Sequence, residues 1–152
     1  MDFSQLIFRQ AEEKDLARII KMLATDIFGK NREDQKNFPT YHSAFLEISA
    51  DKNNFLAVVE FENKIIGTCH LTLMPSLTMQ GSRRMNIEAI RVDDEFQNKG
   101  IGSWMMKKAI EFAKEKKVKI IQLTTNKQRK EAQRFYGRLG FAATHEGMKL
   151  SV

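Results

Sequence analysis

Residues 97–102 read Gln-Asn-Lys-Gly-Ile-Gly and form a polar turn between two regular stretches of the chain. Before the turn, Ile87-Glu-Ala-Ile-Arg-Val92 has the branched apolar composition of a buried strand, and after it Ser103–Lys116 repeats apolar residues at helical spacing. A glycine turn between a strand and a helix points backbone N–H groups and the positive helix end at one anion. Gly100 and Gly102 lack a Cβ atom, so a phosphate can approach the main chain and a positive φ is tolerated. The hexapeptide therefore predicts a phosphate-binding turn.

The same hexapeptide is also compatible with an ordinary glycine-containing loop that opens a helix. It has neither the Walker A spacing nor the G-x-G-x-x-G fingerprint. The sequence thus argues against nucleotide hydrolysis and dinucleotide binding, and the phosphate interpretation depends on a second motif.

That second motif is Ala132-Gln-Arg-Phe-Tyr-Gly-Arg-Leu-Gly-Phe141, which follows one further strand-like stretch. A turn of the form Q/R-x-x-G-x-G/A, then a strand, then a helix bearing A-x-x-F-Y-x-x-L-G-F resembles the GNAT superfamily of acetyl-CoA-dependent N-acetyltransferases. The resemblance is most specific over residues 86–150 and less specific over residues 1–85.

The resemblance implies an α/β fold with a mixed, mostly antiparallel sheet that is splayed at its centre and flanked by helices. The implied element order is β-α-α-β-β-β-α-β-α-β, with residues 1–152 forming one N-acetyltransferase domain and acetyl-CoA lying in the splay. The residues that the resemblance assigns to the pyrophosphate are Gln97, Asn98, Lys99, Gly100, Ile101, Gly102 and, at the helix start, Ser103.

Length and composition agree with one compact catalytic domain. The chain has 152 residues, of which 42% are hydrophobic, enough for a sizeable core. No apolar run approaches the roughly twenty residues that span a bilayer, and no signal-peptide pattern opens the chain. The single cysteine, Cys69, lies in an apolar run and is expected to be a small buried residue in a reducing compartment. We therefore expect a cytoplasmic protein, without a membrane or a bound metal, since no Cys/His cluster has metal-ligand spacing.

A net charge of +6 and an isoelectric point near 9.5 raise the possibility of nucleic-acid binding. The basic residues, however, are interleaved with acidic ones, as in Glu111-Phe-Ala-Lys-Glu-Lys-Lys117, which is typical of a solvated helix face. A basic surface also suits coenzyme A, which carries several phosphate charges. Nucleic-acid binding is accordingly the minor interpretation.

The remaining elements are predicted from periodicity and turn signals. The predicted strands are Phe3–Arg9, Phe55–Phe61, Ile65–Leu73, 84–92, 118–124 and Ala142–Leu150, with a hairpin at Glu62-Asn63-Lys64. The predicted helices are Lys14–Phe28, with Leu16, Ile19, Ile20, Leu23 and Ile27 on one face, Tyr41–Ile48, 100–116 and 130–139. Residues 30–39 and 74–83 are predicted to be loops.

The apolar pattern of the fourth predicted strand changes phase. Met85, Ile87 and Ala89 alternate, and the apolar positions then move to Ile90 and Val92. A shift of one residue is what a β-bulge produces, whereas a strand buried on both faces would explain the pattern without one. The GNAT resemblance implies a bulge here, with the amides of Ile90, Arg91 and Val92 free to bind the thioester carbonyl.

Three side chains are candidates for the chemistry. Glu88 occupies the position where the resemblance implies a general base that acts directly or through water. A carboxylate in a half-buried strand has a raised pKa that suits proton abstraction. A substrate-anchoring or structural ion pair is the alternative role. Tyr136 matches the family's tyrosine, whose hydroxyl can protonate the departing thiolate because a phenol is protonated at neutral pH. The alternative role of Tyr136 is packing beside Phe135. His70 could line the acceptor pocket or be a hydrogen-bonded strand residue.

The chain departs from the family at one position. The asparagine that contacts the cofactor arm in many members is replaced by Arg129, and the nearest asparagine is Asn126, at the end of the preceding strand. Asn126 or a main-chain group is expected to take over this contact, and Phe135 is assigned to the cofactor by the same motif.

The function that we predict is acetyl transfer from acetyl-CoA to a primary amine by direct attack. The alternatives are a catalytically silent acyl-CoA-binding or regulatory module and, less favoured, a nucleic-acid-binding regulator. Acceptor pockets in the family are built from loops that correspond to residues 29–40 and 74–83, whose mixed charges do not single out a small amine or a protein amine. A homodimer is common in the family and is possible here.

Overall fold

A computed structural model describes residues 1–25 and 29–152 of the chain. The elements follow the order β1 (Ile7–Gln10), α1 (Leu16–Ala24), α2 (Phe38–Ala50), β2 (Asn54–Phe61), β3 (Lys64–Met74), α3 (Thr78–Gly81), β4 (Arg84–Val92), α4 (Ile101–Glu115), β5 (Ile120–Leu123) and α5 (Lys130–Arg138). Short 3-10 turns lie at Phe3–Gln5, Glu13–Asp15 and Asp94–Phe96. The chain forms two compact units, Met1–Gln122 and Leu123–Val152. None of the described helices is both long and apolar enough to cross a membrane.

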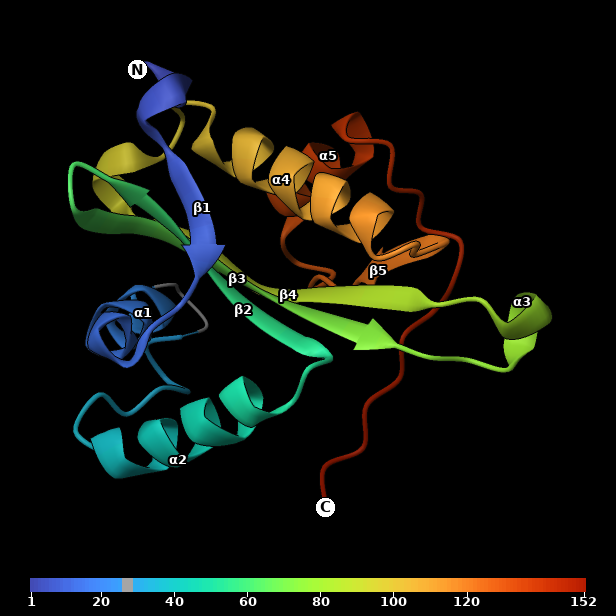
Figure 1. Cartoon of the computed structure of the whole chain (residues 1–152), viewed down its shortest axis with the longest axis horizontal. Helices are drawn as coiled ribbons and strands as arrows, with labels where there is room; N and C mark the ends of the chain where they lie inside the picture. The colour runs from blue at the N-terminus through green and yellow to red at the C-terminus, as the bar shows by residue number, and fades with distance from the viewer. Residues whose placement is uncertain (26–28) are drawn as a thin grey trace. The chain divides into compact units, whose positions relative to one another are not determined.

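The strands form an open five-stranded sheet in the order β1-β2-β3-β4-β5, and the first three pairs are antiparallel. β2 and β3 are joined by the predicted hairpin, whose central residues Glu62 and Asn63 have positive φ values of 48° and 61°. Two such residues make a tight turn whose twist matches that of the flanking strands. Helices α1 and α2 lie on one side of the strands and α4 on the other (Figure 1). The predicted α/β class, with a mostly antiparallel open sheet flanked by helices, is confirmed.

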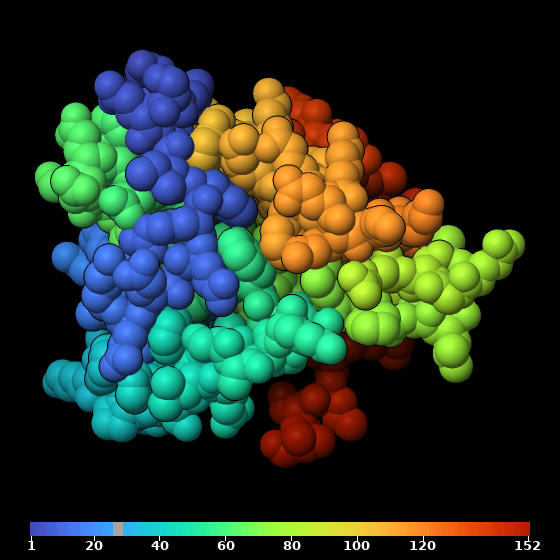
Figure 2. Space-filling view, in the orientation of Figure 1, coloured from blue at the N-terminus to red at the C-terminus, as the bar shows by residue number. Residues whose placement is uncertain are grey.

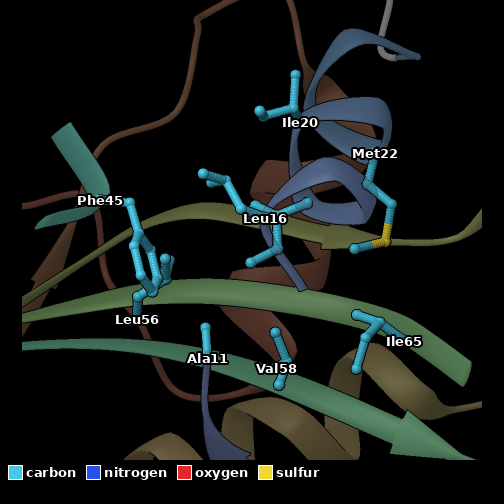
Figure 3. Packing of buried hydrophobic residues seen from close by; sticks show 9 residues of the cluster. Ala11, Leu16, Ile20, Met22, Phe45, Leu56, Val58 and Ile65 are labelled. Atoms are coloured by element: carbon cyan, nitrogen blue, oxygen red, sulfur yellow. The ribbon is translucent and has the colours of Figure 1, made fainter. Parts of the chain in front are cut away.

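The face of the sheet toward α1 and α2 carries one hydrophobic cluster. Figure 3 shows side chains of α1 pointing toward β2 and β3, with Phe45 of α2 beside them. The buried members are Ala11, Leu16, Ile19, Ile20, Met22, Phe45, Leu56, Val58 and Ile65. The predicted inward face of α1 is thus correct for Leu16, Ile19 and Ile20, and Leu23 packs against the cluster. Ile27 and Phe28 lie outside the described residues.

The opposite face of the sheet packs against α4. Cys69 and Leu71 of β3 are fully buried on this side, as are Met105 and Met106 of α4. Burial raises the pKa of the Cys69 thiol to about 12. The sole cysteine of the chain is therefore a packing residue, as predicted, and its thiolate is not formed at neutral pH.

The predicted last strand, Ala142–Leu150, is wrong. These residues form no strand, and Met148 and Leu150 are 95% and 88% exposed. The family resemblance implied a strand at this place, but a segment forms a strand only when a neighbouring strand accepts its backbone hydrogen bonds and one face is buried. The observed order ends at α5, without a strand after it.

The start of the first predicted strand is also corrected. Residues Phe3–Gln5 form a 3-10 turn because the Asp2 carboxylate accepts a hydrogen bond from the Ser4 amide at 2.9 Å, and β1 begins only at Ile7.

Helix α2 begins at Phe38, earlier than predicted, because Pro39 suits the first helical turn. The predicted loop at 74–83 contains the short α3, which extends beyond the ends of β3 and β4 (Figures 1 and 2).

A partly buried ion pair connects β1 to the start of α1. Arg9 donates to both carboxylate oxygens of Asp15, at 2.6 and 3.1 Å, and to Glu60 of β2 at 2.8 Å. Burial raises the pKa of Asp15, but hydrogen bonds from Arg9 and the Glu12 amide outweigh this and hold it below its usual value. A group whose pKa is lower in the folded state stabilises the fold above its unfolded pKa, and this contribution is lost as the pH falls through the folded pKa.

Replacing Asp15 by asparagine should lower the free energy of unfolding at pH 7 by about 2 kcal/mol, since Arg9 keeps Glu60 as a partner. Chemical denaturation measures the change, and the difference from wild type should shrink below about pH 3.5, where the unfolded carboxyl is protonated. Glu111→Gln is the matched control, because Glu111 pairs with Lys108 on an exposed helix face and should contribute less than about 0.5 kcal/mol. An equal loss of unfolding free energy in both variants would contradict a special stabilising role for the Asp15 carboxylate.

Candidate active site

The turn at residues 97–102 has the backbone that the glycine pattern predicts. Gly100 is the N-cap residue of α4 and has φ of +82°, a left-handed conformation that glycine adopts without strain. Gly102 lies inside the helix, so of the two glycines only Gly100 uses the positive φ that glycine tolerates. Asn98 also has a positive φ, 59°, which sequence reasoning missed although asparagine tolerates this region well.

The first turn of α4 presents unpaired amides. The N-cap is a glycine, so no side chain caps the helix, and its first turn holds no acidic residue. Within the part of the chain that the structure describes, the amides of residues 98–103 donate no turn or side-chain hydrogen bond, and the first to do so is that of Trp104, to the Gly100 carbonyl at 3.0 Å. Unpaired amides at the N-terminus of a fifteen-residue helix favour an anion.

Side chains stabilise the segment between β4 and this turn. Asp93 accepts a hydrogen bond from the Glu95 amide at 3.0 Å, and Arg18 of α1 forms an ion pair with its other oxygen. The Arg18 guanidinium also donates to the Ile65 carbonyl at 3.1 Å. Arg18 and Asp93 therefore connect α1, β3 and the end of β4. This ion pair was not predicted, because local sequence patterns do not show which residues far apart in the chain come together.

The predicted β-bulge in β4 is confirmed. Thr68 lies opposite Arg91 and His70 opposite Glu88, so Cys69 alone faces the two residues Ala89 and Ile90. Ala89 has a φ of 52°, unusual for a residue with a Cβ atom. This kink puts Glu88 on the α1/α2 face together with Arg91, instead of leaving them on opposite faces as three-residue spacing in a regular strand would.

The structure corrects the predicted environment of Glu88. Its side chain is 58% exposed, so the described residues do not bury it. Its Oε1 lies 3.4 Å from Nδ1 of His70, whose side chain is only 13% exposed. Glu88 and His70, which are separate candidates in the sequence, are therefore cross-strand neighbours.

The second unit holds the other predicted residues. Tyr136 lies in α5, where its ring contacts Phe135 and Phe141 at centroid distances of 5.2 and 6.0 Å. The side chain of Asn126 accepts a hydrogen bond from the Gln128 amide at 2.8 Å, which forms the turn before α5. The proposed contacts of Tyr136, Phe135 and Asn126 with the cofactor stay predictions.

The segment before α2 contains one ordered polar cluster on the side of α1 and α2. Tyr41 donates a hydrogen bond to Glu33 at 2.9 Å and accepts one from the Asp34 amide at 3.1 Å, while Arg32 contacts Glu33 at 2.5 Å. Burial raises the pKa of Glu33, but the hydrogen bonds from Arg32 and Tyr41 and the charges of Arg32 and Arg91 lower it overall. Glu33 is thus held as a carboxylate.

No group of three His, Cys, Asp or Glu side chains within residues 1–25 and 29–152 is placed to hold a metal ion. The glycine turn at the start of α4 and the bulged strand β4 are the features that bear on a functional assignment.

Comparison with solved structures identifies close relatives of this fold. A protein from Bacillus halodurans described as a transcriptional regulator is 45% identical, with a TM-score of 0.92 over 97% of this chain and 99% of its own. A predicted acetyltransferase from Clostridium acetobutylicum, solved with acetyl-CoA, has a TM-score of 0.75 over 96% of each chain at 21% identity, which shows the fold.

Sequence comparison points to the same group of proteins. An uncharacterized N-acetyltransferase of Methanocaldococcus jannaschii is 44% identical over 55 residues, which cover 36% of this chain and 24% of that protein. The model of the acetyltransferase (GNAT) family matches residues 16–141. This match agrees with the glycine turn and the bulged strand described above, and it shows that the chain belongs to the GNAT acetyltransferase family.

Proposed function

We propose that the protein transfers an acetyl group from acetyl-CoA to a primary amine by direct attack. The observation that carries the proposal is the set of unpaired amides at residues 98–103, held by the left-handed Gly100 at the start of α4. The residues present fit the pyrophosphate of coenzyme A, because an uncapped helix N-terminus with no acidic residue in its first turn favours phosphate. Acetyl-CoA would supply the activated acetyl group as a thioester.

Residues of the chain itself bind the cofactor, stabilise the oxyanion and accept the proton. Gln97 through Ser103 would hold the pyrophosphate, and the backbone of Ile90, Arg91 and Val92 at the bulge would stabilise the developing oxyanion. Glu88 is exposed enough to meet an incoming ammonium group and accept its proton. Buried Cys69, the sole cysteine, leaves no thiol on which to form an acetyl-enzyme, which supports direct attack.

The test is release of free thiol from acetyl-CoA across a panel of amines that includes polyamines, amino acids, aminoglycosides and peptides with a lysine or free N-terminus. We expect saturable turnover with at least one class of amine and none when the amine is omitted. Calorimetry of acetyl-CoA binding accompanies the screen. Binding without turnover on any amine would favour the silent acyl-CoA-binding module, and absence of binding would remove the proposal.

A second candidate function is regulation through nucleic acid, because the 45% identical relative is described as a transcriptional regulator. In this chain, basic residues gather between α3 and the end of α4, at Arg83, Lys116, Lys117 and Lys119. Retention on DNA that weakens steeply with salt and is not displaced by coenzyme A would support this function. Loss of retention in a variant with Lys116, Lys117 and Lys119 changed to glutamine would locate it.

Tyr136→Phe should lower kcat about a hundredfold, at the low end of the roughly 10²–10⁴ that general acid catalysis supplies, since a thiolate is already a fair leaving group. The ring and its contacts with Phe135 and Phe141 are kept, so stability and acceptor KM should change little. Steady-state kinetics measure the effect. A folded variant with wild-type turnover would make Tyr136 a packing residue and water the acid.

A further inference from the structure

Three polar side chains form a continuous line across the sheet on the α1/α2 face. Nε2 of His70 on β3 lies 2.8 Å from Oδ1 of Asn54 on β2, and its Nδ1 lies 3.4 Å from Oε1 of Glu88 on β4. His70 is opposite Glu88 in the strand register. Both ring nitrogens of one half-buried histidine therefore face an oxygen of a different neighbour.

The hydrogen bonds around Asn54 determine which nitrogen of His70 carries a proton. Nδ2 of Asn54 donates to Asp51 at 2.7 Å, so its Oδ1 is the atom that faces the imidazole. The hydroxyl of Thr72 donates to the same Oδ1 at 3.1 Å. Because an amide oxygen only accepts, Nε2 of His70 must be the donor. The neutral ring then has its lone pair on Nδ1, directed toward Glu88.

We propose that His70 is the proton carrier of this enzyme and that Glu88 and His70 act as a pair. The inference rests on the proposed acetyl transfer to an amine. Glu88 takes a proton from the substrate and passes it to Nδ1 of His70, and Asn54 and Asp51 are positioning residues that keep that nitrogen free. The exposed carboxylate meets the substrate, while the less exposed imidazole stores the proton.

The proton balance of the step is complete. The acceptor R–NH₃⁺ gives one proton to Glu88, which hands it to His70, and the neutral amine then attacks the thioester carbonyl. As the C–N bond forms, the nitrogen loses a second proton to the regenerated carboxylate of Glu88. The C–S bond breaks, the thiolate gains one proton, and one proton is released to water.

Other charged and titratable groups share this face and bear on its pH dependence. They are Arg84 and Arg91 of β4, Asp51 at the end of α2, Tyr41 of α2 and, next to Tyr41, Glu33. A substitution at His70 leaves all of these side chains in place, so each of them is present in both wild type and variant. A ratio of the two rates therefore isolates the contribution of His70.

The first experiment measures kcat/KM for the best amine in wild type and His70→Gln from pH 6.5 to 10. Glutamine can still donate to Asn54 but cannot carry a proton. We expect a loss of about 10- to 100-fold at pH 7, below that of a full general base. The loss should shrink toward pH 10, because an amine with a pKa of about 10.4 is then increasingly neutral. A ratio that is constant with pH, or equal to one, would overturn the proposal.

The matched control is His42→Gln. His42 also pairs with a glutamate, Glu13, at 2.9 Å, but lies on α2. It should follow the wild-type profile at every pH. Acetyl-CoA affinity should be unchanged in both variants, which separates a loss of proton transfer from a loss of cofactor binding.

The second experiment reads the imidazole directly and needs no acceptor. In ¹⁵N-labelled wild type, long-range ¹H–¹⁵N spectra should show a proton on Nε2 of His70, alone or together with one on Nδ1. Glu88→Gln should shift the Nδ1 signal, and Asn54→Ala should mix the tautomers. A proton on Nδ1 alone in wild type would overturn the pair. Absence of turnover with every amine would defeat the proposed acetyl transfer, whereas this measurement would still decide the Glu88–His70 arrangement.

Discussion

Glu88→Gln should reduce kcat at pH 7 by about 10²–10³ while acetyl-CoA affinity stays within about twofold of wild type. The amide keeps the size of the side chain and its exposed position on β4, opposite His70, but it cannot accept a proton from an ammonium group. The rate should recover at high pH, where part of the acceptor is already neutral. Steady-state kinetics across pH and calorimetry of acetyl-CoA binding measure the two quantities.

The control for this variant is Glu47→Gln, which removes an exposed carboxylate from α2 and should leave the rates unchanged. A Glu88→Gln enzyme whose pH–rate profile matched that of wild type would exclude Glu88 as the base. A uniform loss at every pH would instead make Glu88 an anchor for the substrate, which is the alternative that its sequence position leaves open.

Gly102→Val should weaken acetyl-CoA binding by more than about a hundredfold. The residue is the second of α4 and lies among the unpaired amides of the first turn, so we expect a branched side chain there to hinder the approach of a phosphate. The fold should survive, since valine is not a poorer helix former than glycine. Calorimetry measures the affinity, and thermal unfolding confirms that the variant is folded.

Lys107→Val is the companion control, because it places the same branched side chain at an exposed position of the same helix. Its affinity for acetyl-CoA should stay close to that of wild type. Unchanged affinity in a folded Gly102→Val protein would remove the glycine turn as the pyrophosphate site and with it the main support for the proposed function.

Much of the site could be predicted from local sequence because its signals are local. Gly100 adopts a conformation that favours glycine, and the phase change after Ala89 marks a bulge that the strand register confirms. Both features follow from steric rules that act within a few residues. The inward face of α1 was predicted for the same reason, from helical periodicity.

These local rules do not predict contacts between residues that are far apart in the sequence. The contact between His70 and Glu88 depends on the register of β3 against β4, and the Arg18–Asp93 ion pair joins residues on α1 and beyond β4. Burial of Glu88 was predicted wrongly because strand membership does not say which residues cover a side chain. The predicted last strand at Ala142–Leu150 failed in the same way, since local sequence does not say whether a partner strand lies beside it.

The sequence by itself determined the order of the elements through α5 except for the short α3, together with the glycine turn, the bulge and the family to which the chain belongs. These depend on backbone preferences and short motifs, which are properties of neighbouring residues. Only the tertiary structure decided that Glu88 is exposed, that His70 faces it, and that Asn54 and Asp51 orient the imidazole. The chemistry of a side chain depends on what surrounds it, and those surroundings are set by strand register and packing between residues far apart in the chain.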